Sequence, residues 1–236
     1  MAKPARWGER VEAKYNEERW RLLAGLREEA IRIMEAFCSF QIDAFTYGSI
    51  ARGDVSEKSD IDIFTPTPPA SFRIELALQD ARIPILKRSV VQATPRYALK
   101  GVVETGERRS VSFPLVKLRE VEKGFYEFAG EATLSTLRQN LRVRGVDKRL
   151  MLIEPTPKGH VESSILGREE EAASLLGVPL ETVRERVRVL MRRDEIGRTG
   201  IFIDREVGPD ETFELAVKKL VEQNPAVRRR FSLERI

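Results

Sequence analysis

The sequence predicts an α+β protein, in which a small mixed sheet with helices precedes a second, mainly helical module. Apolar residues recur at helical spacing over residues 9–37. Short extended runs separated by turn residues fill much of the segment 43–116. Near the carboxy-terminal end, two helical segments meet at Gly177. We therefore divide the chain into a first domain with its amino-terminal helix at 1–125, a connecting helix and strand at 126–159, and a helical module with a helical tail at 160–236.

Composition limits the class of protein. With 42% hydrophobic and 33% charged residues, the chain can form a core under a well-solvated surface, which excludes disorder along most of its length. It has no apolar run long enough to span a bilayer, so we expect a cytoplasmic protein with no membrane partner. The single cysteine, Cys38, lies in an apolar stretch and is expected to be buried. With His160 as the single histidine, a zinc site of the usual kind is excluded.

The charge balance is basic overall. A net charge of +4 and a pI near 9.3 are compatible with an anionic partner without requiring one. Lys, Arg and Glu are abundant while His and Cys are scarce, a balance associated with proteins from thermophiles.

The elements of the first domain follow from local signals. Residues 9–37 form one long amphipathic helix, or two helices broken near Gly25. Strands are predicted at 43–47 and 60–65, and the proline-rich run 65–70 ends the second of them. Ser71 is a candidate N-cap for a helix at 71–83. Extended runs follow at 85–93, 96–105 and 108–116; then 120–155 begins as helix and ends as strand, and 156–160 forms a connection.

Two pairs of residues carry the chemistry of the first domain. Gly48 and Ser49 leave a strand and open a short helical turn, so backbone N–H groups and a hydroxyl point toward one place, as phosphate binding requires. Arg52 follows one turn later and is expected to contact the same phosphates. Asp60 and Asp62 are two positions apart on a strand, so their carboxylates share a face. Paired carboxylates suit Mg²⁺ (or Mn²⁺), whose other ligands would be phosphate and water.

The run YGSIARGDVSEKSDIDIF at residues 47–64 resembles the DNA polymerase beta superfamily of nucleotidyltransferases, in particular the minimal nucleotidyltransferases and the archaeal CCA-adding enzymes. Their signature is Gly-Ser, a spacer and Asp-x-Asp, and the resemblance is specific over 43–65 and looser out to about 118. It implies that Ser49 binds the phosphates of an NTP, and that Asp60 and Asp62 are catalytic metal ligands. The reaction would move a nucleoside monophosphate to a hydroxyl of a nucleic acid, a protein or a small molecule.

The chain departs from the family pattern at one point. Active members usually carry a third carboxylate on a later strand, but here the strand at 108–116 offers Ser110 and Ser112. Glu104 and Glu107 are expected in the preceding turn, and Glu120 is more distant. We therefore keep two alternatives to an ordinary enzyme. One is a catalytically impaired nucleotidyltransferase fold that acts as a nucleotide- or nucleic-acid-binding regulatory module, and the other is the nucleotidyltransferase partner of a toxin–antitoxin pair.

The segment 168–203 has the features of a winged helix-turn-helix. Ala173 allows two helices to cross, Gly177 takes the turn, Val178 fills the core and Pro179 lies near the start of the second helix. The residues after that helix are expected to form a hairpin wing around Gly200.

Arg184 and Arg188 fall on the outward face of the second helix, opposite Val183, Val187 and Leu190, and are candidates for nucleic-acid contact. However, residues 160–236 hold 14 Lys and Arg against 15 Asp and Glu, so a protein partner stays open. Two short helices that break at Asn224–Pro225 are expected to pack on this module.

Overall fold

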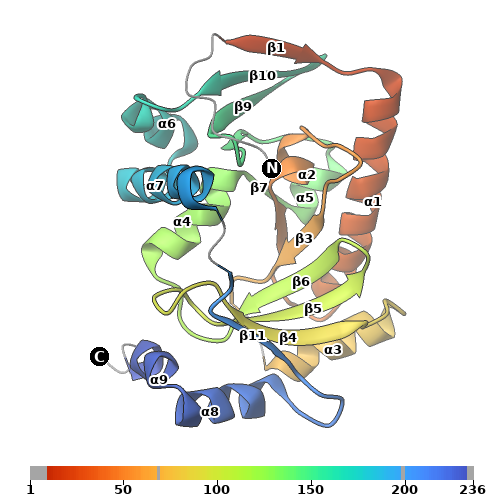
Figure 1. Cartoon of the computed structure of the whole chain (residues 1–236). Coiled ribbons are helices and arrows are strands. Elements are labelled where there is room, and N and C mark those ends of the chain that lie inside the picture. Colours follow the sequence, from red (N-terminus) through yellow and green to blue (C-terminus); the bar gives the residue numbers. More distant parts are fainter. Residues whose placement is uncertain (1–9, 68–69, 198–199, 233–236) are drawn as a thin grey trace. The chain divides into compact units, whose positions relative to one another are not determined.

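The computed structural model describes residues 10–67, 70–197 and 200–232. Its contacts divide these residues into two compact units, each built from separate stretches of the chain (Figure 1). Unit 1 comprises residues 10–31, 45–59 and 120–197, and unit 2 comprises residues 32–44, 60–119 and 200–232. Among the described helices, none is long and apolar enough to cross a membrane.

An antiparallel sheet in unit 1 brings together strands from both ends of its sequence. The strands follow the order β1 (Val11–Lys14), β10 (Gly159–Ser164), β9 (Met151–Thr156) and β8 (Gly145–Val146). The prediction of helix at 11–14 was wrong, because these residues pair with β10, with Val11 opposite Glu162. The helix begins only at Glu17, where the Asn16 side chain accepts the N–H of Arg19 at 2.9 Å.

The other elements of unit 1 surround the Gly-Ser turn. Helix α1 (Glu17–Ser39) is continuous through Gly25, and its first part belongs to unit 1. Strand β2 (Phe45–Tyr47) leads into α2 (Ser49–Arg52) and pairs antiparallel with β7 (Glu131–Thr133). Helices α4 (Glu120–Ala129) and α5 (Leu134–Arg138) precede and follow β7.

The helix-turn-helix elements of the sequence are present as α6 (Glu169–Leu176) and α7 (Leu180–Ile196). Gly177 ends α6 in the left-handed conformation, and Val178 and Val183 lie in the hydrophobic core between the helices. The predicted hairpin wing around Gly200 falls partly outside the described residues and is not shown. Residues 195–196 continue α7, positions 198–199 lie outside the described residues, and the next strand pairs elsewhere, in unit 2.

Unit 2 is a mixed sheet with helices. Its strands follow the order β11 (Ile203–Glu206), β4 (Lys87–Gln92), β5 (Lys100–Gly106), β6 (Arg109–Pro114) and β3 (Ile61–Phe64). Only the β3–β6 pair among them is parallel. Its helices are α3 (Ser71–Asp80), α8 (Phe213–Gln223) and α9 (Pro225–Ser232). The expected break at Asn224–Pro225 is confirmed, and so is the end of β3 before the proline-rich run, in which Pro68 and Pro69 lie outside the described residues.

Three local expectations in unit 2 need correction. Ser71 is the first residue of α3 rather than its cap, and its hydroxyl donates to Glu214 of α8 at 2.9 Å. Helix α8, which was expected to pack on the helix-turn-helix, packs on the sheet of unit 2, with the ring of Phe213 5.0 Å from that of Phe113. Cys38 is exposed, because α1 turns the neighbouring Phe37 inward instead.

Candidate functional site

The Gly-Ser turn has the backbone that the sequence predicted. Gly48 adopts φ 80° and ψ −143°, a conformation open to glycine and strained for other residues, and α2 begins directly after it. The Gly48 N–H donates to the carbonyl of Gly130 at 2.9 Å, which ties the turn to the start of β7. The first N–H groups of a helix have no partner within the helix. The turn therefore offers backbone donors of the kind that bind phosphate.

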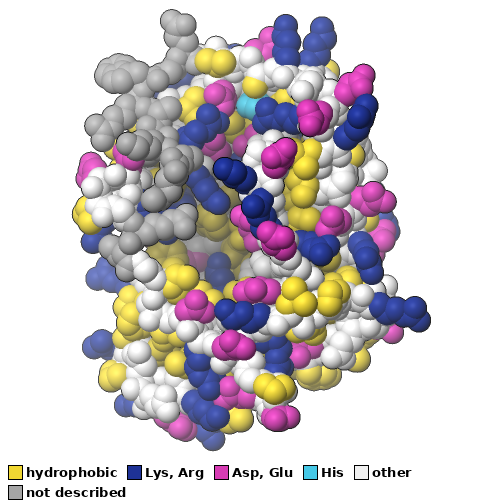
Figure 2. Space-filling view, turned by 45° about the vertical axis from the view of Figure 1, so that its right-hand side comes forward, with side chains coloured by type: hydrophobic (Ala, Val, Ile, Leu, Met, Phe, Trp, Pro, Cys, Tyr) yellow, Lys and Arg dark blue, Asp and Glu magenta, His cyan; other side chains and the backbone are white. Residues whose placement is uncertain are grey.

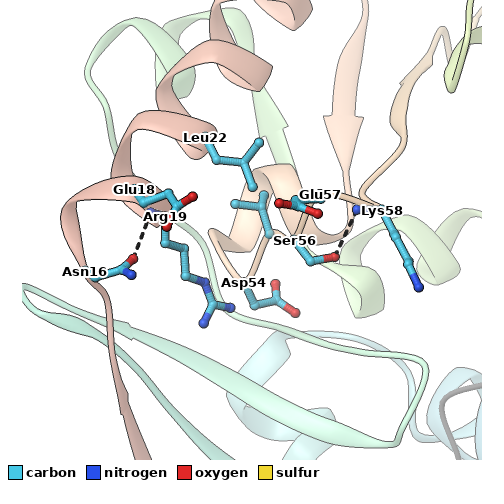
Figure 3. Close-up of a pocket in the computed structure, with 9 residues that line it drawn as sticks. Asn16, Glu18, Arg19, Leu22, Asp54, Ser56, Glu57 and Lys58 are labelled. Carbon is cyan, nitrogen blue, oxygen red and sulfur yellow. Dashed lines mark hydrogen bonds between the residues drawn. The ribbon is translucent and has the colours of Figure 1, made fainter.

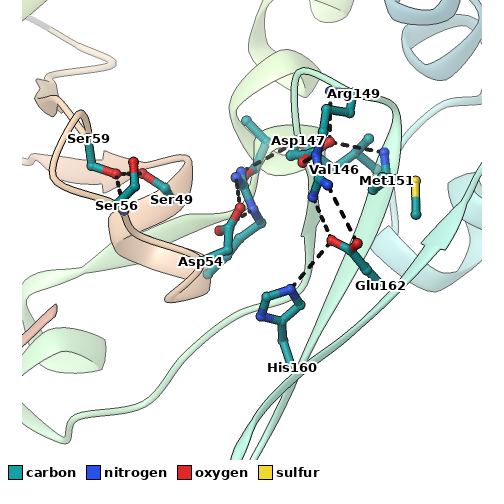
Figure 4. Close-up of polar contacts among 12 residues, drawn as sticks. Ser49, Asp54, Ser56, Ser59, Val146, Asp147, Arg149, Met151, His160 and Glu162 are labelled. Carbon is teal, nitrogen blue, oxygen red and sulfur yellow. Dashed lines mark hydrogen bonds and ion pairs between the residues drawn. The ribbon is translucent and has the colours of Figure 1, made fainter. Parts of the chain in front are cut away.

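The hydroxyl of Ser49 is held in place by the loop that follows. It donates to Oγ of Ser59 at 3.1 Å, and the same oxygen accepts the N–H of Ser56 at 3.0 Å (Figure 4). The loop that contains Ser56 and Ser59 thus folds back onto Ser49. The Ser49 hydroxyl can exchange its hydrogen bond to Ser59 for one to a phosphate oxygen.

A buried arginine that we did not single out from the sequence supports α2 from below. Arg27 of α1 is 3% exposed, and its Nε and Nη2 donate to the carbonyls of Ile50 and Ala51, each at 3.0 Å. Burial, together with the nearby charge of Arg142, lowers the pKa of Arg27 to about 10. In an amphipathic helix rich in Arg, no local signal distinguishes this residue from its solvated neighbours.

Arg52 occupies a different place from the one expected. It is 5% exposed, and its guanidinium makes a two-point ion pair with Asp54 at 2.9 and 3.0 Å. A third donor of the group reaches the carbonyl of Ala129 at 2.6 Å. This arrangement disfavours the expected phosphate contact, because the buried pair would have to open. Arg52 instead connects α2 to the end of α4.

A polar cluster supports the sheet of unit 1 near Asp54. The Tyr15 hydroxyl lies 2.7 Å from Nδ1 of His160, and Nε2 of His160 lies 3.6 Å from Glu162. Arg149 binds both Glu162 and Asp147 (Figure 4). Burial is the main cause that lowers the pKa of His160 below its ordinary value. The cluster therefore holds His160 in a buried place between Tyr15 and Glu162.

The two aspartates belong to unit 2 and share a face of the sheet. Ile61 and Ile63 are buried on one side of β3, so the alternation of the strand places Asp60 and Asp62 together on the other. Asp60 is exposed and Asp62 is partly exposed. Carboxylate oxygens on one face are the kind of ligand that a hard cation such as Mg²⁺ or Mn²⁺ takes.

Strand β6 runs beside the aspartates and brings a serine to the place where a third acid was missing. The parallel register sets Ser110 opposite Asp62, and the Ser110 hydroxyl donates to Oδ1 of Asp62 at 2.8 Å. This confirms that the strand at 108–116 lies next to the Asp-x-Asp strand and presents a neutral side chain. Ser112 lies opposite Phe64, further along the strand.

Glu104 is on strand β5 rather than in the expected turn. It lies opposite Ser110, so Asp62, Ser110 and Glu104 form a row across three strands on one face. Its carboxylate is 3.9 Å from Nζ of Lys87. Glu107 and Glu120 are exposed. Within the described residues, no group of three or more acidic, His or Cys side chains is arranged to hold a metal.

A pocket of about 480 Å³ in unit 1 was not expected from the sequence (Figure 3). It lies between the start of α1 and the loop that leads from α2 toward Asp60. Its lining mixes both charges with two apolar side chains; the residues are Asn16, Glu18, Arg19, Leu22, Asp54, Val55, Ser56, Glu57 and Lys58. Its volume suits a small molecule.

The outward arginines of α7 lie as expected. Arg184 and Arg188 are exposed, while Val183 and Leu190 are buried. Arg184 is 3.3 Å from Glu170 of α6, a surface pair that contributes little binding energy of its own. On the face shown in Figure 2, cationic and anionic side chains are interspersed, without a large patch of one sign.

Comparison with known proteins agrees with the site geometry. Residues 28–125 match the nucleotidyltransferase domain family. A search of curated proteins found no match. The matched segment contains the Gly-Ser turn, both aspartates and the strand with Ser110. The match therefore supports a domain of the nucleotidyltransferase superfamily, nucleotidyl transfer as the general class of activity, and an NTP as the substrate.

Proposed function

We propose that the protein is an Mg²⁺- or Mn²⁺-dependent nucleotidyltransferase that binds NTP more readily than it transfers from it. The observation that carries this proposal is the Ser110–Asp62 hydrogen bond, because it puts a neutral ligand where a third carboxylate would serve the acceptor. Serine is a weaker ligand for a hard cation than a carboxylate. The family match supports the nucleotide-binding part of the proposal.

Each residue has a defined task in this proposal. The N–H groups of the Gly48 turn and the Ser49 hydroxyl bind phosphate oxygens, while Asp60 and Asp62 hold the cation. The cation, when bound, neutralises the charge that builds up on the phosphates during transfer. Ser110 orients Asp62 through its hydrogen bond. The acceptor hydroxyl oxygen forms a bond to the α-phosphorus, the bond from that phosphorus to the β-phosphate oxygen breaks, and pyrophosphate leaves as the hydroxyl proton passes to solvent.

The direct test is incubation with each α-labelled NTP and Mg²⁺ or Mn²⁺, with RNA, DNA and the protein itself as acceptors. We expect slow label transfer by wild type. The rate should fall by roughly 10²-fold further in Asp62→Asn, because one metal ligand becomes neutral. Asp80→Asn, which removes an exposed carboxylate at the end of α3, is the matched control. Transfer that is equal in Asp62→Asn and wild type would reject the two-carboxylate site.

A second candidate function is favoured by the same serine. If Ser110 holds the cation that would serve the acceptor hydroxyl too weakly for transfer, the fold acts as a nucleotide-binding regulatory module. NTP binding in Mg²⁺ without label transfer to any acceptor would support this alternative.

Nucleic acid is the acceptor class that we would test first, because α7 exposes Arg184 and Arg188. The double substitution of both by Glu should weaken binding of RNA or DNA and leave NTP binding unchanged. Equal nucleic-acid binding by the double variant and wild type would remove α7 from the interface.

A further inference from the structure

An aromatic corner lies directly beside the Gly-Ser turn in unit 1. Tyr47 is the last residue of β2 and is followed at once by Gly48. Its ring lies 5.9 Å from that of Phe125 of α4, at an interplanar angle of 73°. Both rings are partly exposed, whereas Tyr126, which supports them from 5.0 and 5.2 Å, is 2% exposed. The two partly exposed rings thus pack edge-to-face with each other and with a buried third.

The corner is held rigidly on both of its sides. Phe45 and Tyr47 both pack on Tyr126, so one face of β2 is fixed against α4. The guanidinium of Arg186 covers the Phe125 ring at 4.7 Å. A ring that is already held in place, as Tyr47 is, loses little entropy when a planar ligand stacks on it.

An acidic side chain lies on the same face as Tyr47. Glu131 is directly opposite Tyr47 in the antiparallel β2–β7 pair, so the two side chains emerge side by side. Gly130, just before it, accepts the N–H of Gly48 and has φ 80°, and a Cβ there would meet the carbonyl of Arg144 at 2.7 Å. Glu131 is therefore placed by the hydrogen bond between Gly48 and Gly130, which also fixes the Gly-Ser turn. Glu131 is partly buried, and this burial, and next the charge of Glu127, raise its pKa above the ordinary value.

We propose that the Tyr47 ring forms the stacking surface for the base of the bound nucleotide, with Phe125 holding that ring edge-on, and that Glu131 accepts a hydrogen bond from an amino group on the edge of the base. The inference rests on the proposed function, since it assumes that the phosphates occupy the Gly48–Ser49 turn. Tyr47 and Ser49 flank Gly48, so the two places lie beside the same turn. Every base has a face that can stack on an aromatic ring.

The carboxylate gives the corner a preference among bases. An ionised carboxylate only accepts hydrogen bonds. Cytosine presents an amino donor where uracil presents a carbonyl acceptor, and the two bases have the same size. CTP should therefore bind more tightly than UTP, while ATP and GTP, whose bases also carry amino groups, should bind as well as CTP or better.

The test is calorimetric binding of the four NTPs and of inorganic tripolyphosphate in Mg²⁺. Tyr47→Leu should weaken NTP binding about tenfold, because the stacking ring is lost, and leave tripolyphosphate binding unchanged. Phe125→Leu should weaken NTP binding less, because the Tyr47 ring loses a neighbour that holds it. Tyr47→Phe keeps the ring and should restore most of the NTP binding that Tyr47→Leu loses. Phe72→Leu removes a 62% exposed ring from α3 and is the matched control.

The edge contact has its own test. Wild type should prefer CTP over UTP by about tenfold, and Glu131→Gln should remove the preference, because an amide both donates and accepts. If Tyr47→Leu fails to fold by circular dichroism, Phe125→Leu and Glu131→Gln decide the question. Folded variants that bind every NTP like wild type, or a wild type that does not distinguish CTP from UTP, would overturn the inference. If wild type binds neither NTP nor tripolyphosphate, the Gly48–Ser49 turn does not bind phosphate, and the proposed function is rejected as well.

Discussion

Replacing Ser110 with Asp is the sharpest test of the proposal that Asp60 and Asp62 hold a cation next to a neutral serine. The substitution removes the 2.8 Å hydrogen bond to Asp62 and puts a second carboxylate directly opposite it on the neighbouring strand. Adjacent strands are about 4.8 Å apart, so the two charges would be separated by about 5 Å. Without a cation, the carboxylates repel each other; with one, they form a stronger site than the serine allows.

The size of the repulsion follows from this spacing. Two unit charges about 5 Å apart interact by about 3 kcal/mol at an effective dielectric constant of about 20. Because Asp62 is partly exposed, solvent screening lowers the expected loss of unfolding free energy to about 2 kcal/mol. For a chain of this length, the melting temperature should fall by about 4 to 8 °C in EDTA. A saturating divalent cation at about 100 times its dissociation constant would return about 2.7 kcal/mol.

Thermal unfolding of wild type, Ser110→Asp and Ser112→Asp, each in EDTA and in Mn²⁺, measures both effects. The Ser110 variant should melt below wild type in EDTA and gain more stability from Mn²⁺ than wild type does. Ser112 lies opposite Phe64, so the Ser112 variant should show no such gain. The reasoning is refuted if Ser110→Asp gains no more from Mn²⁺ than wild type, or if the Ser112 variant gains equally.

Three further predictions use other parts of the structure. Arg27→Met should lower the unfolding free energy in urea by about 2–4 kcal/mol and weaken NTP binding, because two carbonyls of α2 lose their donor; unchanged values would show that α2 needs no such support. Glu104→Gln should leave Mn²⁺ affinity unchanged, and a clear loss measured by calorimetry would make Glu104 the missing third ligand. The pKa of His160 is lower in the folded than in the unfolded state, so its contribution to stability is complete above about pH 6.5, where His160 is neutral in both states. This contribution is lost as pH falls below that value toward the folded pKa. His160→Gln should reduce this pH dependence in denaturation curves, and an unchanged curve would assign the dependence to other groups.

The elements with strong local signals could be predicted from the sequence. The Gly48 turn needs a conformation that favours glycine, and the sequence shows a Gly-Ser step at the end of a strand. The period of two in β3 places Asp60 and Asp62 on one face whatever their neighbours are. Gly177 in the left-handed conformation and the buried Val178 define the turn between α6 and α7 in the same local way.

Only the tertiary structure decided which residues meet these elements. The choice of Ser110 over Ser112 depends on the register between β3 and β6, and a shift along the strand would change it without changing the local pattern. Arginine is usually a surface residue, yet Arg27 and Arg52 are buried, and each donates hydrogen bonds to backbone carbonyls of a segment distant in sequence. The pairing of β1 with β10 joins residues that are about 150 positions apart in the chain. The sequence by itself thus determined the turn, the paired carboxylates and the helix-turn-helix, because backbone conformation and side-chain period are local properties. Register and the partners of buried charges were decided by the fold, because they depend on contacts between segments that are remote in sequence.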